Sequence, residues 1–318
     1  MSPSDRVKAA VAGALPTAYG GVAHWHRPRA RRGSWLLRAE TGGHAPATLL
    51  VEIPKRANGR GAGGVRAAGP DDASEAEFRA LEAIADAVAA SGDPGLAAVV
   101  PVAYVSEVGA IVTEQLRARP LKDLLGWRDD DPTEYFRRAG RWLSLFHGIG
   151  GRSPRPFQAH ETIDEAIATD GSLADLASTV IDAVRTLAYR PSLEVVIHGD
   201  FTTANILVTI DDRVAVVGPE RRPGRPTEDV ADLLTELRFA DGGTFGVARR
   251  RSTVESWAQG VLDGYPGLDP AVLVCDRAIA ILRLWSAREE RLRGPARLVL
   301  KPFRRRVASE VRALLDAL

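Results

Sequence analysis

The stretch HGDFTTANILVTI, residues 198–210, constrains the fold of this chain more than any other part of the sequence. A short polar loop carries Asp200 and, five residues later, Asn205, and it runs directly into an apolar segment. The segment is rich in β-branched residues, which is typical of a buried strand. We therefore expect a loop with a rigid base that holds a carboxylate and a carboxamide at a fixed separation.

This pairing of side chains suits phosphoryl transfer. That reaction needs a carboxylate to orient or deprotonate the acceptor hydroxyl, and a ligand for the Mg²⁺ that bridges the phosphates. Asp200 would supply the first and Asn205 the second.

Composition sets the class of protein. The 318 residues are 45% apolar and 26% charged, which is neither a disordered nor a membrane composition. A net charge of +1 gives no global attraction to nucleic acid or anionic lipid. Cys275 is the only cysteine, so an intrachain disulfide is excluded, and its apolar setting predicts a buried thiol.

No segment has the length of a signal peptide or of a membrane span, so we expect a soluble, cytoplasmic protein. The basic, amphipathic segment 291–318 predicts a helix that closes the domain. Contact of this segment with a membrane surface is the alternative.

The N-terminal part alternates strands with one helix. Segments 33–40 and 47–53 predict a pair of strands, and segments 96–105 and 109–116 predict two more, the last ending at Glu114. A helix is predicted between these pairs of strands. Ser74 is its expected N-cap, and Glu77, three residues later, completes a capping box.

Beyond residue 119 the pattern becomes mainly helical. Segment 134–149 places apolar residues on one stripe, and segments 172–189, 227–239 and 269–292 are also predicted helices. The exception is a hairpin of two short strands joined at Asp211 and Asp212.

At this point the sequence resembles the aminoglycoside phosphotransferase and choline kinase family, whose catalytic loop reads H-G-D-x-x-x-x-N. The resemblance implies an α+β, two-lobed protein-kinase-like fold: an N-lobe with a small antiparallel sheet and one helix over residues 1–116, and a mainly helical C-lobe over 117–318. It also implies ATP and Mg²⁺ as cofactors and a small-molecule substrate.

Carried over residue by residue, Asp200 matches the family's catalytic base, His198 the loop histidine and Asn205 the metal-binding Asn. Asp229 matches a later Asp that braces the loop from the start of a helix. In the connection between the lobes, the segment from Glu114 to Leu116 lies where the family binds adenine through backbone groups.

The first departure from the family follows the hairpin. The strand there ends in a metal-binding Asp in the family, whereas VAVVGPE places Gly218 at that position. Glu220 lies two residues on and is the first substitute ligand; Asp211 and Asp212 are weaker ones.

The second departure is in the N-lobe, where the family places a phosphate-contacting Lys in the third strand. The best-aligned residue here is Glu52, and Lys55 follows three residues later. Side chains alternate along a strand, so Lys55 substitutes only if the chain bulges near Pro54. Glu77 would be the helix partner of that Lys, although its place in the capping motif explains it equally well.

Two functions stay open from the sequence. The first is an ATP- and Mg²⁺-dependent phosphotransferase that acts on a hydroxyl of a sugar or aminoglycoside-like compound. The second is a catalytically impaired pseudokinase that binds a nucleotide or a partner. A nucleic-acid-binding role is not expected, because interleaved aromatic residues and a basic overall charge are missing.

Overall fold

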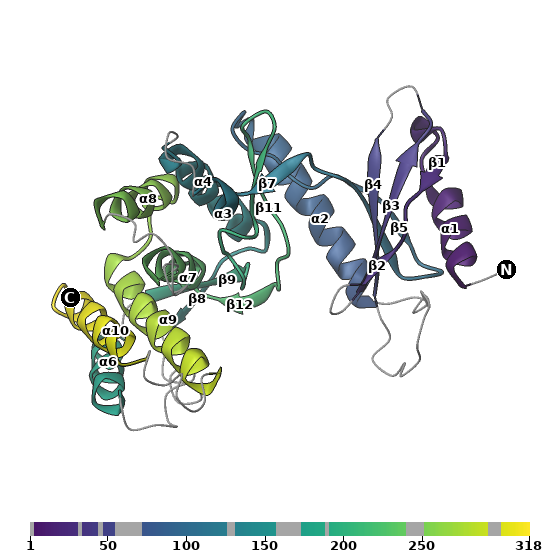
Figure 1. Ribbon diagram of the computed structural model, residues 1–318. Helices are drawn as coiled ribbons and strands as arrows, with labels where there is room; N and C mark the ends of the chain where they lie inside the picture. Colours follow the sequence, from purple (N-terminus) through teal and green to yellow (C-terminus); the bar gives the residue numbers. More distant parts are fainter. Residues whose placement is uncertain are drawn as a thin grey trace. The chain divides into compact units, whose positions relative to one another are not determined.

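The computed structural model describes residues 3–30, 34–43, 47–54, 72–125, 131–156, 173–187, 191–239, 251–291 and 300–318 (Figure 1). The chain divides into two compact units: Met1–Ala118 with Thr209–Ala215, and Arg119–Val208 with Val216–Leu318. No helix in the described ranges is long and apolar enough to cross a membrane.

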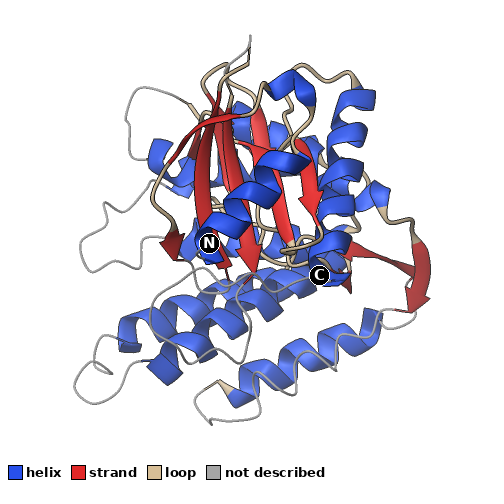
Figure 2. Cartoon of the chain, turned by 90° about the vertical axis from the view of Figure 1, so that its right-hand side faces the viewer, coloured by secondary structure: helices blue, strands red, loops and turns tan. Residues whose placement is uncertain are grey.

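The first unit is built on an antiparallel sheet, which Figure 2 shows as a row of neighbouring strands. The strand order is β1-β3-β4-β6-β5, and the short β2 also pairs with β3. The strands are β1 Val22–Trp25, β2 Arg29–Ala30, β3 Ser34–Thr41, β4 Thr48–Pro54, β5 Pro101–Val105 and β6 Ala110–Glu114. The predicted pairing of segments 33–40 and 47–53 is confirmed, as is the end of a strand at Glu114.

Helix α1 (Pro3–Ala14) covers one face of this sheet. Its fully buried Val7 and Val11, one turn apart, pack against alternate strand residues such as Leu37, Leu49 and Val51. The expectation of one helix in this part of the chain is therefore wrong. The short, alanine- and glycine-rich segment gives a weak apolar pattern, which is why the sequence did not reveal it.

Helix α2 (Asp72–Ser91) belongs to the opposite face, where its Phe78 ring lies 6.2 Å from the ring of Tyr104 on β5. The helix includes Asp72 and Ala73, so Ser74 lies inside its first turn and is not the residue that precedes it. The predicted cap position is therefore wrong by three residues, or nearly one turn.

The second unit is mainly helical. Its helices are α3 Leu121–Leu124, α4 Thr133–Ile149, α6 Ala174–Leu187, α7 Pro226–Phe239, α8 Arg251–Gly264, α9 Pro270–Arg291 and α10 Leu300–Leu315. Buried side chains of α6, α9 and α10 form one continuous core that includes the fully buried Cys275. Burial raises the pKa of the Cys275 thiol to about 12, consistent with an unreactive side chain.

The remaining strands are short. Strands β8 Ser153–Pro156, β9 Pro191–Ile197 and β12 Arg222–Gly224 form one small sheet in the second unit. Strands β7 Ala118–Pro120, β10 Ile206–Thr209 and β11 Val214–Val216 form another. The predicted hairpin is confirmed as β10 and β11, with Asp212 in a left-handed turn conformation. An antiparallel sheet followed by a mainly helical unit confirms the α+β class.

Candidate active site

The loop between β9 and β10 holds Asp200 and Asn205 together. The Asn205 carboxamide nitrogen donates to the Asp200 main-chain oxygen at 2.8 Å and to its carboxylate at 2.7 Å. The main-chain N–H of Asn205 also donates to the Thr202 carbonyl at 3.0 Å, closing a turn. The Asp200 side chain is exposed, so a carboxylate that is fixed in direction faces solvent.

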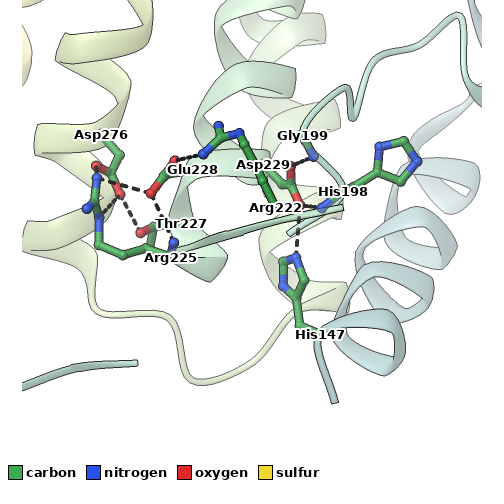
Figure 3. Close-up of polar contacts among 9 residues, drawn as sticks. All are labelled: His147, His198, Gly199, Arg222, Arg225, Thr227, Glu228, Asp229 and Asp276. Atoms are coloured by element: carbon green, nitrogen blue, oxygen red, sulfur yellow. Dashed lines mark hydrogen bonds and ion pairs between the residues drawn. The ribbon is translucent and has the colours of Figure 1, made fainter. Parts of the chain in front are cut away.

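Asp229, in the first turn of α7, anchors the start of this loop (Figure 3). Its fully buried carboxylate accepts the N–H groups of His198 at 2.6 Å and Gly199 at 2.8 Å. The expectation that Asp229 braces the loop from a helix start is thus confirmed.

A third donor reaches the same carboxylate from α4. His147 is fully buried, and its Nε2 lies 2.9 Å from Asp229 Oδ2 while its Nδ1 lies 3.1 Å from the Tyr265 hydroxyl. An ionised carboxylate only accepts, so Nε2 carries the proton, and in the neutral ring Nδ1 accepts from Tyr265. Burial raises the pKa of Tyr265 to about 12, which keeps its hydroxyl protonated.

His198 lies beneath the loop. Its ring is fully buried, with the rings of Trp142, Phe146 and Phe201 around it at centroid distances of 5.8–6.4 Å. Burial lowers the pKa of His198, so the ring is neutral near pH 7. Its Nδ1 accepts the N–H of Asp200 at 3.3 Å.

Glu236 anchors the other end of the loop, a role that the sequence did not reveal. Its carboxylate accepts the N–H of Thr203 at 2.7 Å and the Thr203 hydroxyl at 2.6 Å. Glu236 follows Asp229 by seven residues, or two helical turns, so both carboxylates lie on one side of α7. The seven-residue spacing of Asp229 and Glu236 in a predicted helix is the sequence feature that indicates this second anchoring carboxylate.

Glu220 lies directly over Gly199. The N–H of Glu220 donates to the His198 carbonyl at 2.8 Å, and a Cβ placed on Gly199 would lie only 3.2 Å from the Glu220 Cβ. It would also lie 3.4 Å from Glu220 Oε2 and 3.7 Å from Arg222 Nε. Gly199, with φ +79°, is thus required both by its conformation and by this close approach. The exposed Glu220 carboxylate is therefore adjacent to the loop.

Gly218 faces the same loop from the end of β11. A Cβ placed there would lie 3.8 Å from Asn205 Oδ1, an ordinary contact distance, so there is room for a side chain directed toward Asn205. The backbone has φ +73°, in the left-handed region that favours glycine.

A buried network of charges ties the start of α7 to α9 (Figure 3). Arg225 contacts Asp276 at 2.7 Å and Glu228 at 3.3 Å, and Arg222 contacts Glu228 at 3.0 Å. Burial lowers the pKa of Arg225, but the adjacent Asp276 carboxylate outweighs this effect and the pKa is raised overall. The Arg225 guanidinium thus stays charged, and Arg222, paired with Glu228, lies beside Gly199.

The segment after β6 leaves main-chain groups available in the first unit. The N–H of Glu114 donates to the Val100 carbonyl at 2.9 Å and that of Gln115 to the Thr48 carbonyl at 2.7 Å. Among the described residues, nothing forms a hydrogen bond with the main chain of Leu116. The Glu114 carboxylate is partly buried and accepts the Tyr19 hydroxyl at 2.7 Å.

Glu52 lies on the α2 face of the sheet. It is directly opposite Ile111, which is opposite Tyr104, and Tyr104 contacts α2. Its carboxylate accepts the Ser34 hydroxyl. The register of the sheet therefore places the Glu52 side chain on the same face as α2. Glu77 is exposed on α2, and Lys55 lies outside the described residues.

Few side chains near the loop that carries Asp200 and Asn205 could coordinate a metal ion. No group of three or more His, Cys, Asp or Glu side chains within the described ranges could hold one. Mg²⁺ in phosphoryl-transfer sites needs only one or two protein oxygens beside the phosphates and water. Asn205 Oδ1 and the Glu220 carboxylate satisfy that requirement in number and in ligand type.

Comparisons with known proteins agree with this geometry. The family model described as phosphotransferase enzyme family (APH) matches residues 29–271. No curated protein sequence matches the chain.

Solved structures show the same fold. An amicoumacin kinase in complex with AMP-PNP, Ca²⁺ and Ami has a TM-score of 0.57 at 11% identity, covering 98% of this chain and 94% of that one. Choline kinase LicA from Streptococcus pneumoniae has a TM-score of 0.53 at 12% identity, covering 98% and 99%. A choline/ethanolamine kinase family protein from Mesorhizobium loti has a TM-score of 0.52 at 17% identity, also covering 98% and 99%.

These relatives confirm the kinase-like fold expected from the H-G-D-x-x-x-x-N loop. Since the family match spans well over half of the sequence, the chain belongs to the phosphotransferase enzyme family.

Proposed function

We propose that this protein transfers phosphate from ATP, with Mg²⁺, to a hydroxyl of a small molecule such as a sugar or an aminoglycoside-like compound. The observation that carries the proposal is the Asp200–Asn205 pair, fixed by two hydrogen bonds in a loop that α7 anchors at both ends. A loop that had no use for this geometry would not need two anchoring carboxylates.

Asp200 would act on the acceptor. Its exposed carboxylate orients the hydroxyl and accepts the proton that leaves as the acceptor oxygen bonds to the transferred phosphorus. The bond from that phosphorus to the oxygen of the departing ADP breaks in the same displacement. His198, buried below, holds the loop by its ring packing and by the hydrogen bond to Asp200 N–H.

Asn205 and Glu220 would hold Mg²⁺. The Asn205 carboxamide nitrogen is committed to Asp200, which leaves its oxygen on the side of Gly218. Glu220 would supply the carboxylate that Gly218 does not have. When bound, the ion neutralises charge on the phosphates.

The nucleotide base would bind to the first unit. We assign adenine recognition to main-chain groups from Glu114 to Leu116, where the Leu116 N–H has no hydrogen bond within the described residues. Lys55, with Glu77 as its helix partner, remains our candidate for a phosphate contact.

The second candidate function is a pseudokinase, and two specific residues favour it. Gly218 offers no metal ligand, and Glu52 places a negative charge where the family has a positive one. A unit charge at about 4 Å is worth about 4 kcal/mol at an effective dielectric constant of 20, so the reversal matters.

Nucleotide binding with and without metal separates the two functions. We expect ATP to raise the melting temperature in the presence of Mg²⁺ and to raise it much less with EDTA. Equal stabilisation by ATP in both conditions would contradict a metal-dependent phosphotransferase and support the pseudokinase.

A further inference from the structure

An exposed patch on the α2 face of the sheet holds two arginines, Arg29 and Arg38, around Glu52. Arg29 on β2 lies directly opposite Leu36 on β3, which lies directly opposite Glu52 on β4. Arg38 lies opposite Leu50, and it is therefore a diagonal neighbour of Glu52, at a Cα separation of about 7–8 Å. Directly paired residues point to the same face, so both arginines share the face of Glu52.

Neither arginine forms an ion pair with a residue that the structure describes. Both side chains are exposed, and no carboxylate within the described ranges forms an ion pair with Arg29 or Arg38. Glu40 is the other acid on this face; its hydrogen bond with His26, at 2.9 Å, and the positive charge of Arg38 both lower its pKa. The Glu52 carboxylate in turn accepts the hydroxyl of Ser34. The patch thus carries two guanidinium groups that form no ion pair within the described residues, beside the carboxylates of Glu52 and Glu40.

The patch also lies at a suitable distance from the segment that we assign to adenine. Glu114 is opposite Leu49 on β4. Arg29 lies at the level of Glu52, three residues beyond Leu49, and Arg38 lies at the level of Leu50, one residue beyond it. Three residues of strand span about 10 Å, which is of the order of the distance between the base and the outer phosphates of a nucleotide, so Arg38 lies between the base and Arg29.

We propose that Arg29 and Arg38 bind the phosphate chain of the nucleotide beside the contact assigned to Lys55, and so supply the positive charge that is missing at the position of Glu52. This inference rests on the proposed function, since it needs a nucleotide whose base lies near Glu114. Guanidinium groups suit this task because they bind phosphate oxygens through paired N–H donors. The positive charge has moved from β4 to β2 and β3, and Glu52 lies beside it as a partner of Ser34.

The test compares the affinities of ATP and adenosine for the full chain by titration calorimetry. The variants are Arg29→Ala, Arg38→Ala and the double variant. Arg79→Ala is the matched control, because Arg79 is an exposed arginine of the same unit that pairs with Glu75 and Glu82 on α2. We expect each single variant to lower the affinity for ATP by about tenfold and to leave the affinity for adenosine unchanged. Arg79→Ala should change neither affinity.

Glu52→Gln provides a second variant with the opposite sign. Removing this negative charge is expected to strengthen ATP binding severalfold and to leave adenosine unchanged. Melting temperatures show that each variant is folded.

Three outcomes overturn the inference. If the arginine variants prefer ATP over adenosine by the same factor as wild type and with the same affinities, the phosphates are bound by other residues. If the variants lose affinity for ATP and for adenosine equally, the arginines support the structure of the sheet and do not contact the phosphates. If wild type binds neither ligand, the proposed function itself fails.

Discussion

Gly218 is at the position where the family has a metal-binding Asp. The residues around it show whether a carboxylate would fit there. The side of Gly218 that would carry a Cβ faces Asn205 Oδ1 across 3.8 Å. The site has therefore kept the room and the direction for a carboxylate, but its backbone, at φ +73°, has a conformation that suits glycine.

Gly218→Asp should separate these two effects. We expect the left-handed conformation to lower the free energy of unfolding by about 1 kcal/mol, as for most residues other than glycine. We also expect ATP binding to depend more strongly on Mg²⁺, because a carboxylate joins Asn205. Gly218→Ala is the control, with the same strain and no carboxylate. If both variants respond to Mg²⁺ alike, the position has no part in metal binding.

Asp232 on α7 makes stability depend on pH. Burial raises its pKa to about 7, Arg283 opposes the shift, and Asp229 and Glu228 add to it. An unfolded Asp titrates near pH 3.9, so between about pH 4 and 7 the folded chain binds more protons than the unfolded one. The contribution of Asp232 to the free energy of unfolding should therefore fall as the pH rises through this range.

Urea unfolding at several pH values measures this effect. We expect Asp232→Asn to remove part of the decline between pH 4 and pH 7. Asp182→Asn, at an exposed position on α6, should leave the decline as it is in wild type. If Asp232→Asn follows the same curve as wild type, the pKa of this group is not raised.

At the scale of elements, α7 positions the loop through two carboxylates two turns apart. Asp229 is fully buried and accepts three hydrogen bonds, whereas Glu236 is partly exposed and accepts two. Replacing Asp229 should lower the free energy of unfolding more than replacing Glu236, because a buried donor left without an acceptor is costly.

We expect Asp229→Asn to lower the free energy of unfolding by about 2–4 kcal/mol, and Glu236→Gln by about 1 kcal/mol. Urea denaturation measures both. Glu134→Gln is the control, because its ion pairs on α4 are near the surface. Equal losses for Asp229→Asn and Glu134→Gln would show that the carboxylate of Asp229 does not hold the loop.

The sequence predicted elements whose signal is local. Segment 134–149 places Phe136, Ala139, Leu143 and Phe146 on one stripe, and all four are buried on α4. The paired strands β3 and β4, and the hairpin of β10 and β11, follow from alternation and turn residues in the same way.

The sequence could not predict what depends on packing between distant segments. Strand β9 was missed because its partners, β8 and β12, are short and give no alternation of their own. The contact of Glu236 with Thr203 joins residues 33 positions apart. The side-chain orientation of Glu52 depends on register across three strands.

For the whole molecule, membership of the phosphotransferase enzyme family and an anchored H-G-D-x-x-x-x-N loop argue for a site that has kept its chemistry. The two departures, Gly218 and Glu52, each have a neighbour that would take over the lost role: Glu220 beside the loop, and Arg29 and Arg38 on the sheet. We therefore propose an altered but working phosphotransferase.

Phosphate transfer tests this claim most directly. Purified protein is incubated with ATP, Mg²⁺ and a panel of sugars and aminoglycoside-like compounds, and mass spectrometry detects any acceptor that gains one phosphate. We expect transfer to at least one class of acceptor and a loss of at least a hundredfold in Asp200→Asn, in line with the removal of a catalytic base. Transfer by Asp200→Asn at the wild-type rate, or no transfer by a folded wild type that binds ATP, would contradict it.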